Sequence, residues 1–114
     1  MKLTFVQLPA FDADWRHLKL SDDDARELEL ELMKRPDAGP PIQGACGVRK
    51  LRFAPQSWAS GKSGAVRVIY AHFPKQATIY LFLAYGKDEQ GTLTPDEKKA
   101  CCQLMREIKT LLDG

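Results

Sequence analysis

Histidine and cysteine are scarce in this sequence, which limits the metal and redox chemistry that it can support. Only His17, His72 and three cysteines occur among 114 residues, and no two cysteines have the C-x-x-C spacing of a zinc site. We therefore expect no metal ion and no cofactor. Cys101 and Cys102 are adjacent inside an expected helix and Cys46 is far from them in sequence, so we expect no disulfide and a reducing compartment.

Long hydrophobic runs are also missing. No run approaches the about 20 apolar residues that cross a bilayer, and Pro9 and Asp12 interrupt the N-terminal stretch before it can form the apolar part of a signal peptide. The composition, 44% hydrophobic and 28% charged, is typical of a globular protein, and the length fits one domain over residues 1–114. We expect a cytoplasmic protein with no membrane partner.

Acidic residues are absent from the middle of the chain. Residues 38–87 contain seven Lys/Arg and no Asp/Glu, whereas residues 1–37 carry a net charge of −3 and residues 88–114 one of −2. Such a segregated positive stretch favours a polyanionic partner. The alternative is a sheet whose few surface charges happen to be basic.

The hydrophobic pattern predicts an α+β domain. One amphipathic helix is expected to begin after the N-cap Ser21 and to end before Pro36. Thr94 and Glu97 form the capping box of the last expected helix. Runs rich in Val, Ile, Leu, Phe and Tyr predict strands, of which the last two are too close in sequence for anything but an antiparallel hairpin. The expected strands are 3–8, 48–54, 65–73 and 77–85; a weaker helix is expected at 11–19.

Basic side chains on the expected central strands are the candidates for function. Alternation along a strand places Lys50 and Arg52 on one face and Arg49 on the other. Arg67 is the single charge in an apolar strand, so it must either reach the rim of the sheet or have an anionic partner. Each has a structural alternative, namely a solvated strand face for the first three and an ion pair for Arg67.

Three further residues are candidates for the same cleft. Tyr85 and Lys87 share a face at the end of the last strand, and Lys62 belongs to a polar loop that could close over it. Lys62 could equally be an ordinary loop lysine. The Gly61–Ser63 triplet that contains it is not a phosphate-binding P-loop, because Gln56 replaces the required glycine and a strand follows instead of a helix. Tyr70 could contact RNA or could lie in the core.

Four segments in this order, IQGACGVRKLRF, GKSGAVRVIY, YLFLAYGKDE and LTPDEKK, resemble the RelE superfamily of bacterial toxins, most closely its HigB-like branch. The resemblance covers nearly the whole chain from Leu20 onward. It implies the toxin of a type II toxin–antitoxin pair, a ribosome-dependent mRNA endonuclease. It also implies a HigA-like helix-turn-helix antitoxin, with which the toxin could form a larger complex on operator DNA. Two departures from the pattern are Ala45-Cys46 before Gly47 and the lack of a match to the C-terminal catalytic Tyr or His of other RelE branches.

A metal-free ribonuclease makes the ribose 2′-OH attack the adjacent phosphorus, and Arg and Lys stabilise the extra charge of the transition state. We expect the catalytic residues to be Arg67 on the reacting phosphate, Lys62 as a loop clamp, and Tyr85 or Lys87 in proton transfer or base stacking. The expected RNA-binding residues are Arg49, Lys50, Arg52 and Tyr70.

Two other functions fit the same sequence. A ParE-like gyrase poison would share the fold but do no bond-breaking chemistry, and the basic strands count against it. A non-catalytic RNA-binding module would use the same positive face for phosphates alone. Cleavage of message in a translating extract separates the three.

Overall fold

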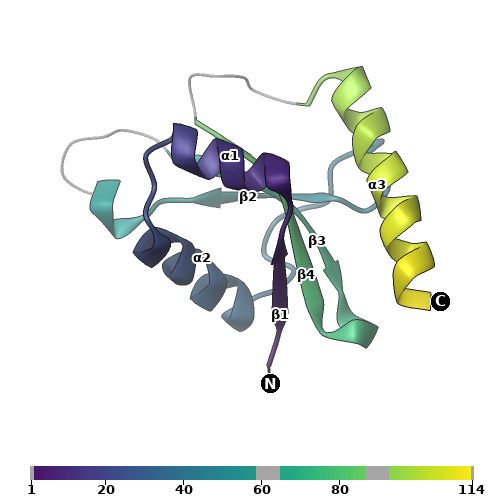
Figure 1. The fold of residues 1–114 in the computed structure, drawn as a ribbon, viewed down its shortest axis with the longest axis horizontal. Helices are drawn as coiled ribbons and strands as arrows, with labels where there is room; N and C mark the ends of the chain where they lie inside the picture. The colour runs from purple at the N-terminus through teal and green to yellow at the C-terminus, as the bar shows by residue number, and fades with distance from the viewer. Residues whose placement is uncertain (1, 59–64, 87–92, 114) are drawn as a thin grey trace.

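A computed structural model describes residues 2–58, 65–86 and 93–113 of the chain, so Lys62 and Lys87 lie outside the described residues. Four strands and three α-helices follow one another in the expected order (Figure 1). The strands are β1 (Thr4–Gln7), β2 (Arg49–Phe53), β3 (Val66–Phe73) and β4 (Thr78–Tyr85), and the helices are α1 (Pro9–His17), α2 (Asp22–Lys34) and α3 (Pro95–Asp113). This arrangement confirms the predicted α+β class.

The strands form a single sheet in the order β1-β4-β3-β2. Strands β2, β3 and β4 are an antiparallel meander, and a 3₁₀ turn at Pro74–Gln76 closes the predicted hairpin between β3 and β4. Strand β1 lies parallel to β4 at the edge. The two strands that carry Lys50, Arg52 and Arg67 are therefore neighbours in the sheet.

The expected helix caps are present. Ser21 and Asp24 form a reciprocal capping box at α2, in which the Ser21 amide donates to the Asp24 carboxylate at 2.9 Å and the Asp24 amide donates to Ser21 Oγ at 3.1 Å. Thr94 and Glu97 do the same at α3, at 2.8 and 3.1 Å. Each box satisfies two amides that the first turn would otherwise leave unpaired. Within the described residues, none of the helices is long and apolar enough to cross a membrane.

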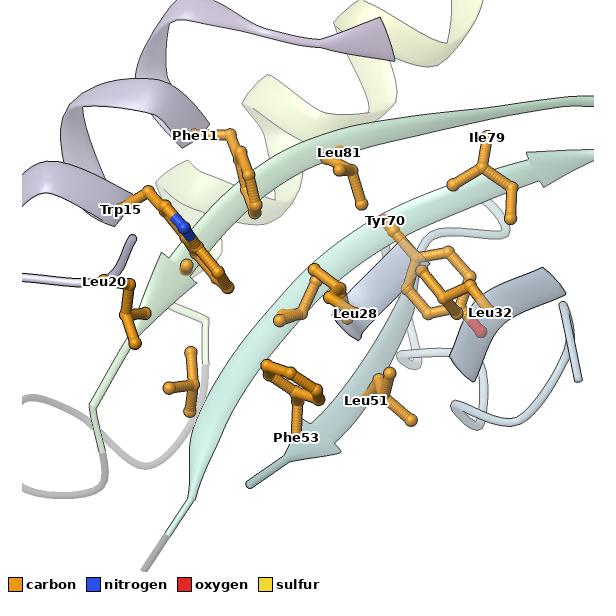
Figure 2. Packing of buried hydrophobic residues seen from close by; sticks show 13 residues of the cluster. Phe11, Trp15, Leu20, Leu28, Leu32, Leu51, Phe53, Tyr70, Ile79 and Leu81 are labelled. Carbon is orange, nitrogen blue, oxygen red and sulfur yellow. The ribbon is translucent and has the colours of Figure 1, made fainter. Parts of the chain in front are cut away.

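Hydrophobic side chains pack on both faces of the sheet. On one face, α1 and α2 cover β2, β3 and β4, and Figure 2 shows Phe11, Trp15 and Leu28 of the helices meeting Phe53 and Leu81 of the strands. On the other face, α3 covers the sheet through a shorter stripe of buried residues, Cys101, Met105 and Ile108. We call these the α1/α2 face and the α3 face.

A β-bulge interrupts the alternation of β4. Ile69 pairs with Leu83 and Tyr70 with Leu81, so Phe82 is an extra residue in β4. Before the bulge, Ile79 and Leu81 belong to the core of the α1/α2 face; after it, Tyr85 belongs to the core of the α3 face. The bulge therefore decides which face Tyr85 occupies.

The expectation that no disulfide forms was wrong. Cys46 and Cys102 are disulfide-bonded, with their Cα atoms 5.3 Å apart, and Cys101 is a free, buried thiol. Sequence distance was a poor guide because α3 folds back over the loop that precedes β2. Cys46 adopts a positive φ of 61° in that loop, beside Gly47 with φ 93°, and this turn directs it to the helix. Because disulfides are rare in reducing compartments, the cysteines do not support the expected reducing compartment.

Candidate nucleic-acid interface

Arg52, Arg67 and Tyr85 lie side by side in one row across three strands. The register pairs Arg52 of β2 directly with Arg67 of β3, and Arg67 directly with Tyr85 of β4. Residues that face each other in an antiparallel pair point to the same side, so all three project from the α3 face. We call these three residues the Arg67 row. Its outer members, Arg52 and Tyr85, are 33 positions apart in the sequence.

Among the residues that the structure describes, no carboxylate neutralises Arg67. Its guanidinium donates one hydrogen bond, from Nη1 to the carbonyl oxygen of Ala65 at 2.7 Å. Within residues 2–58, 65–86 and 93–113, Arg67 takes part in no ion pair. The residue that it faces, Arg52, is exposed and carries the same charge. Two like charges in a directly facing pair are destabilising. An anion placed between them would relieve that repulsion, which makes this part of the row a candidate anion site.

Tyr85 places a buried phenol next to these charges. It is 6% exposed, and among the described residues its hydroxyl has no hydrogen-bond partner. Burial raises the pKa of Tyr85 above its ordinary value, against the opposing effect of the Arg67 charge and with a smaller contribution from Glu97 in the same direction as burial. The phenol therefore keeps its proton at neutral pH. It can donate a hydrogen bond or a proton, but it is a poor base.

Lys50 extends the positive charge along β2. It pairs with Ile69, so it shares the α3 face with the Arg67 row, and it is partly buried. The segments that carry Lys62 and Lys87 join the chain just before Ala65 and just after Gly86, at the end of the sheet where the row lies. Four of the eight predicted site residues are thus on one face: Lys50, Arg52, Arg67 and Tyr85.

Arg49 and Tyr70 are placed elsewhere. They face each other on the α1/α2 face. Tyr70, which Figure 2 labels, is fully buried, and its hydroxyl accepts from the Gly39 amide at 3.0 Å and donates to the Pro36 carbonyl at 2.8 Å. Arg49 donates to the Gly39 carbonyl at 2.8 Å and pairs with Asp37 at 3.6 Å. Both side chains hold the loop after α2, so this position does not support the prediction that they bind RNA.

Two features near the row were not predicted from the sequence. Glu97, expected only as a helix cap, also lies close enough to raise the pKa of Tyr85. The Phe82 bulge brings Tyr85 to the α3 face. An acidic residue in a capping motif carries no sign of a second role, and the register of a strand is not visible in its composition. Among the described residues, no cluster of three or more His, Cys, Asp or Glu could hold a metal ion.

Comparison with known proteins places this geometry in a known fold. No family model matches the chain. A solved structure of the toxin RelE from E. coli, in a variant with two arginines replaced by alanine and in the free state, superposes with a TM-score of 0.54. The match covers 92% of this chain and 98% of that one, at 16% sequence identity. At this identity the likeness establishes the fold alone, and the chain has a RelE-like α+β fold.

Proposed function

We propose that this protein is the toxin of a type II toxin–antitoxin pair and that it cleaves messenger RNA on the ribosome. The observation that carries the proposal is the Arg67 row, in which two arginines and a buried phenol share one face of the sheet. Neither arginine takes part in an ion pair within the described residues. The basic middle of the chain and the RelE-like fold support the same activity. The HigB-like branch remains our assignment from the four sequence segments.

Arg67 would hold the phosphate that reacts. In the proposed reaction the ribose 2′-oxygen attacks the adjacent phosphorus, the bond from phosphorus to the 5′-oxygen breaks, and a 2′,3′-cyclic phosphate remains. The transition state gathers extra negative charge on the phosphate oxygens. A fixed guanidinium stabilises that charge without having to reorganise, and Arg52 and Lys50 would hold the neighbouring phosphates.

Tyr85 would protonate the leaving 5′-oxygen. Its pKa is raised by burial, so it carries the proton that this step requires at neutral pH. The group that removes the proton from the 2′-oxygen is then a different one. Lys87 remains the candidate for that transfer and Lys62 for a clamp on the RNA, and both lie outside the described residues.

The ribosome would orient the message for cleavage, because the site itself is too small to do so. Charge stabilisation and positioning are the main terms of this mechanism, and a message held by the ribosome needs no further ordering before it reacts. The proposed partner that restrains the toxin is a HigA-like antitoxin with a helix-turn-helix domain. It would also carry the toxin to operator DNA.

Cleavage in a purified translation system tests the proposal. We expect the protein to cut message on translating ribosomes and to leave the same RNA uncut when it is naked. The ends should be a 2′,3′-cyclic phosphate and a 5′-hydroxyl. Activity should survive 1,10-phenanthroline, which removes transition metals and leaves the Mg²⁺ that ribosomes need. Loss of cleavage with phenanthroline, restored by added metal, would contradict the metal-free mechanism.

Expression in bacteria separates the proposal from the gyrase-poison alternative. Induction without an antitoxin should stop protein synthesis before any DNA damage appears, and coexpression of the antitoxin should restore growth. Arg67→Ala is the matched inactive control. Early DNA breaks with intact message would replace the proposed function by that of a gyrase inhibitor, and ribosome binding without cleavage would leave a non-catalytic RNA-binding module.

A further inference from the structure

Helix α3 carries a second group of basic side chains, separate from the Arg67 row. At 3.6 residues per turn, Lys98, Lys99, Arg106 and Lys109 fall within roughly 100° of the helix circumference. The buried stripe of α3 adjoins this arc, with its centre about 100° away around the helix, and Lys98 at the shared edge is partly buried. We call the four cations the α3 basic stripe. Within the described residues, none of them takes part in an ion pair.

A groove runs along this stripe. It has a volume of about 650 Å³ and is lined mainly by Gly44, Pro95, Lys98, Lys99, Cys102 and Arg106. Three of its lining side chains are cations, and none of the lining residues is acidic. A groove with uncompensated positive charge selects an anionic occupant.

The groove is fixed to the loop that leads into β2. The Cys46–Cys102 disulfide crosslinks that loop to the centre of the stripe. A Cβ atom built on Gly44 would lie 3.7 Å from Cδ of Lys98, so the lysine stem already packs against the loop. The same loop continues into the strand that bears Lys50 and Arg52. The basic stripe and the Arg67 row are therefore held by one crosslinked unit.

The shape of the stripe indicates the occupant. From Lys98 to Arg106 the helix rises about 12 Å, which is the length of roughly three to four nucleotides along one strand of a nucleic-acid helix. A small anion would meet only part of this stripe. The lining residues include no aromatic side chain on which unpaired bases could stack, and helical RNA is bound mainly through its phosphates and 2′-hydroxyls.

We propose that the α3 groove binds the phosphate backbone of helical RNA, on a strand other than the one that is cut. This inference rests on the proposed function for its biological setting, because a ribosome-dependent nuclease must hold the ribosome as well as the message. The groove binds the RNA of the ribosome, and the Arg67 row cleaves the message.

Binding to a short RNA duplex tests the inference without any cleavage. The probe is a 2′-O-methylated RNA duplex, which cannot react, and the measurement is its affinity at several salt concentrations. Each phosphate contact contributes about 0.9 to the slope of log K against log salt. The triple variant Lys98→Gln/Lys99→Gln/Arg106→Gln should therefore lower the slope by about 2 to 3 and weaken binding by at least about tenfold near 0.1 M salt.

The control variant removes the same charge from the other side of the molecule. Arg16, Arg26 and Lys34 are exposed on α1 and α2. Replacing these three with Gln should leave the slope for the duplex unchanged. Single Gln variants in the groove, each lowering the slope by about 1, repeat the test if the triple variant does not fold.

The outcomes distinguish this inference from the proposed function. An unchanged duplex slope in the triple variant overturns the inference, whatever the cleavage assay shows. Weaker binding of the triple variant to a single-stranded RNA probe alone would also overturn the inference, because the groove would then bind the message. If the slope falls as expected but the parent protein cuts no message on ribosomes, the RNA-binding groove stands and the nuclease proposal fails.

Discussion

Replacing Arg67 with Ala should abolish cleavage and leave the protein folded. The guanidinium would contact the reacting phosphate, and loss of one such group costs about 10²–10³ in rate, or roughly 3–4 kcal/mol of transition-state stabilisation. The effect on stability is much smaller. The mutation removes one hydrogen bond to Ala65, worth about 1 kcal/mol, but it also removes the unfavourable facing of Arg52, worth about 0.2–1 kcal/mol. These terms nearly cancel, so we expect the melting temperature to change by only a few degrees.

The assay is single-turnover cleavage of message on translating ribosomes, with thermal melts of the same preparations. Lys75→Ala is the control, because Lys75 is exposed in the turn between β3 and β4, at the opposite end of these strands from the row. It should cut at the parent rate. Arg52→Ala should lose less activity than Arg67→Ala, since it would hold a neighbouring phosphate. The reasoning is refuted if Arg67→Ala cuts as fast as the parent, or if it fails only because it is unfolded.

Three further predictions follow from the surroundings of the row and from the core. In a spectrophotometric titration, the tyrosinate absorbance that is lost in the Tyr85→Phe variant should develop above pH 10, because the folded state holds this proton more tightly than the unfolded chain does. The free energy of unfolding should fall over the same pH range. A transition of Tyr85 below pH 10 would contradict the argument that burial raises its pKa. Replacing Cys46 and Cys102 with Ser removes a crosslink across a sequence separation of 56 and should lower the free energy of unfolding by roughly 4 kcal/mol. The reduced parent protein should melt at the same temperature as the variant. Equal melting temperatures of the oxidised parent and the variant would argue against the crosslink. Tyr70→Phe leaves the Gly39 amide unpaired and should cost about 1–3 kcal/mol of stability, measured by urea unfolding. The affinity for RNA should not change. Weaker RNA binding by a folded variant would restore the prediction that Tyr70 contacts RNA.

The fold was largely predictable from the sequence because its signals are local. The caps at Ser21 and Thr94 mark the beginning of α2 and α3, and the short connection at Pro74 forces the hairpin between β3 and β4. Alternation along β2 also assigned Lys50 and Arg52 to one face correctly. These features depend only on residues that are close in the sequence.

The site was predicted less completely because it depends on pairing between distant residues. Composition could not show that Tyr70 lies in the core with its hydroxyl on the loop after α2, since a tyrosine in the strand that carries Arg67 fits a nucleic-acid surface equally well. The Cys46–Cys102 pair was missed for the same reason: only the docking of α3 brings the two residues together. The alignment of Arg52 with Arg67 required the register of the sheet.

The bulge at Phe82 makes the proposed active site sensitive to the length of one strand. Deleting this single residue would restore regular alternation in β4 and turn Tyr85 toward Ile79 and Leu81, away from Arg67. Removal of one codon would thus separate Tyr85 from Arg67 while nearly all of the sequence stayed the same. Among relatives with this architecture that keep both the arginine and the tyrosine, loss of the extra residue in β4 should therefore mark inactive copies.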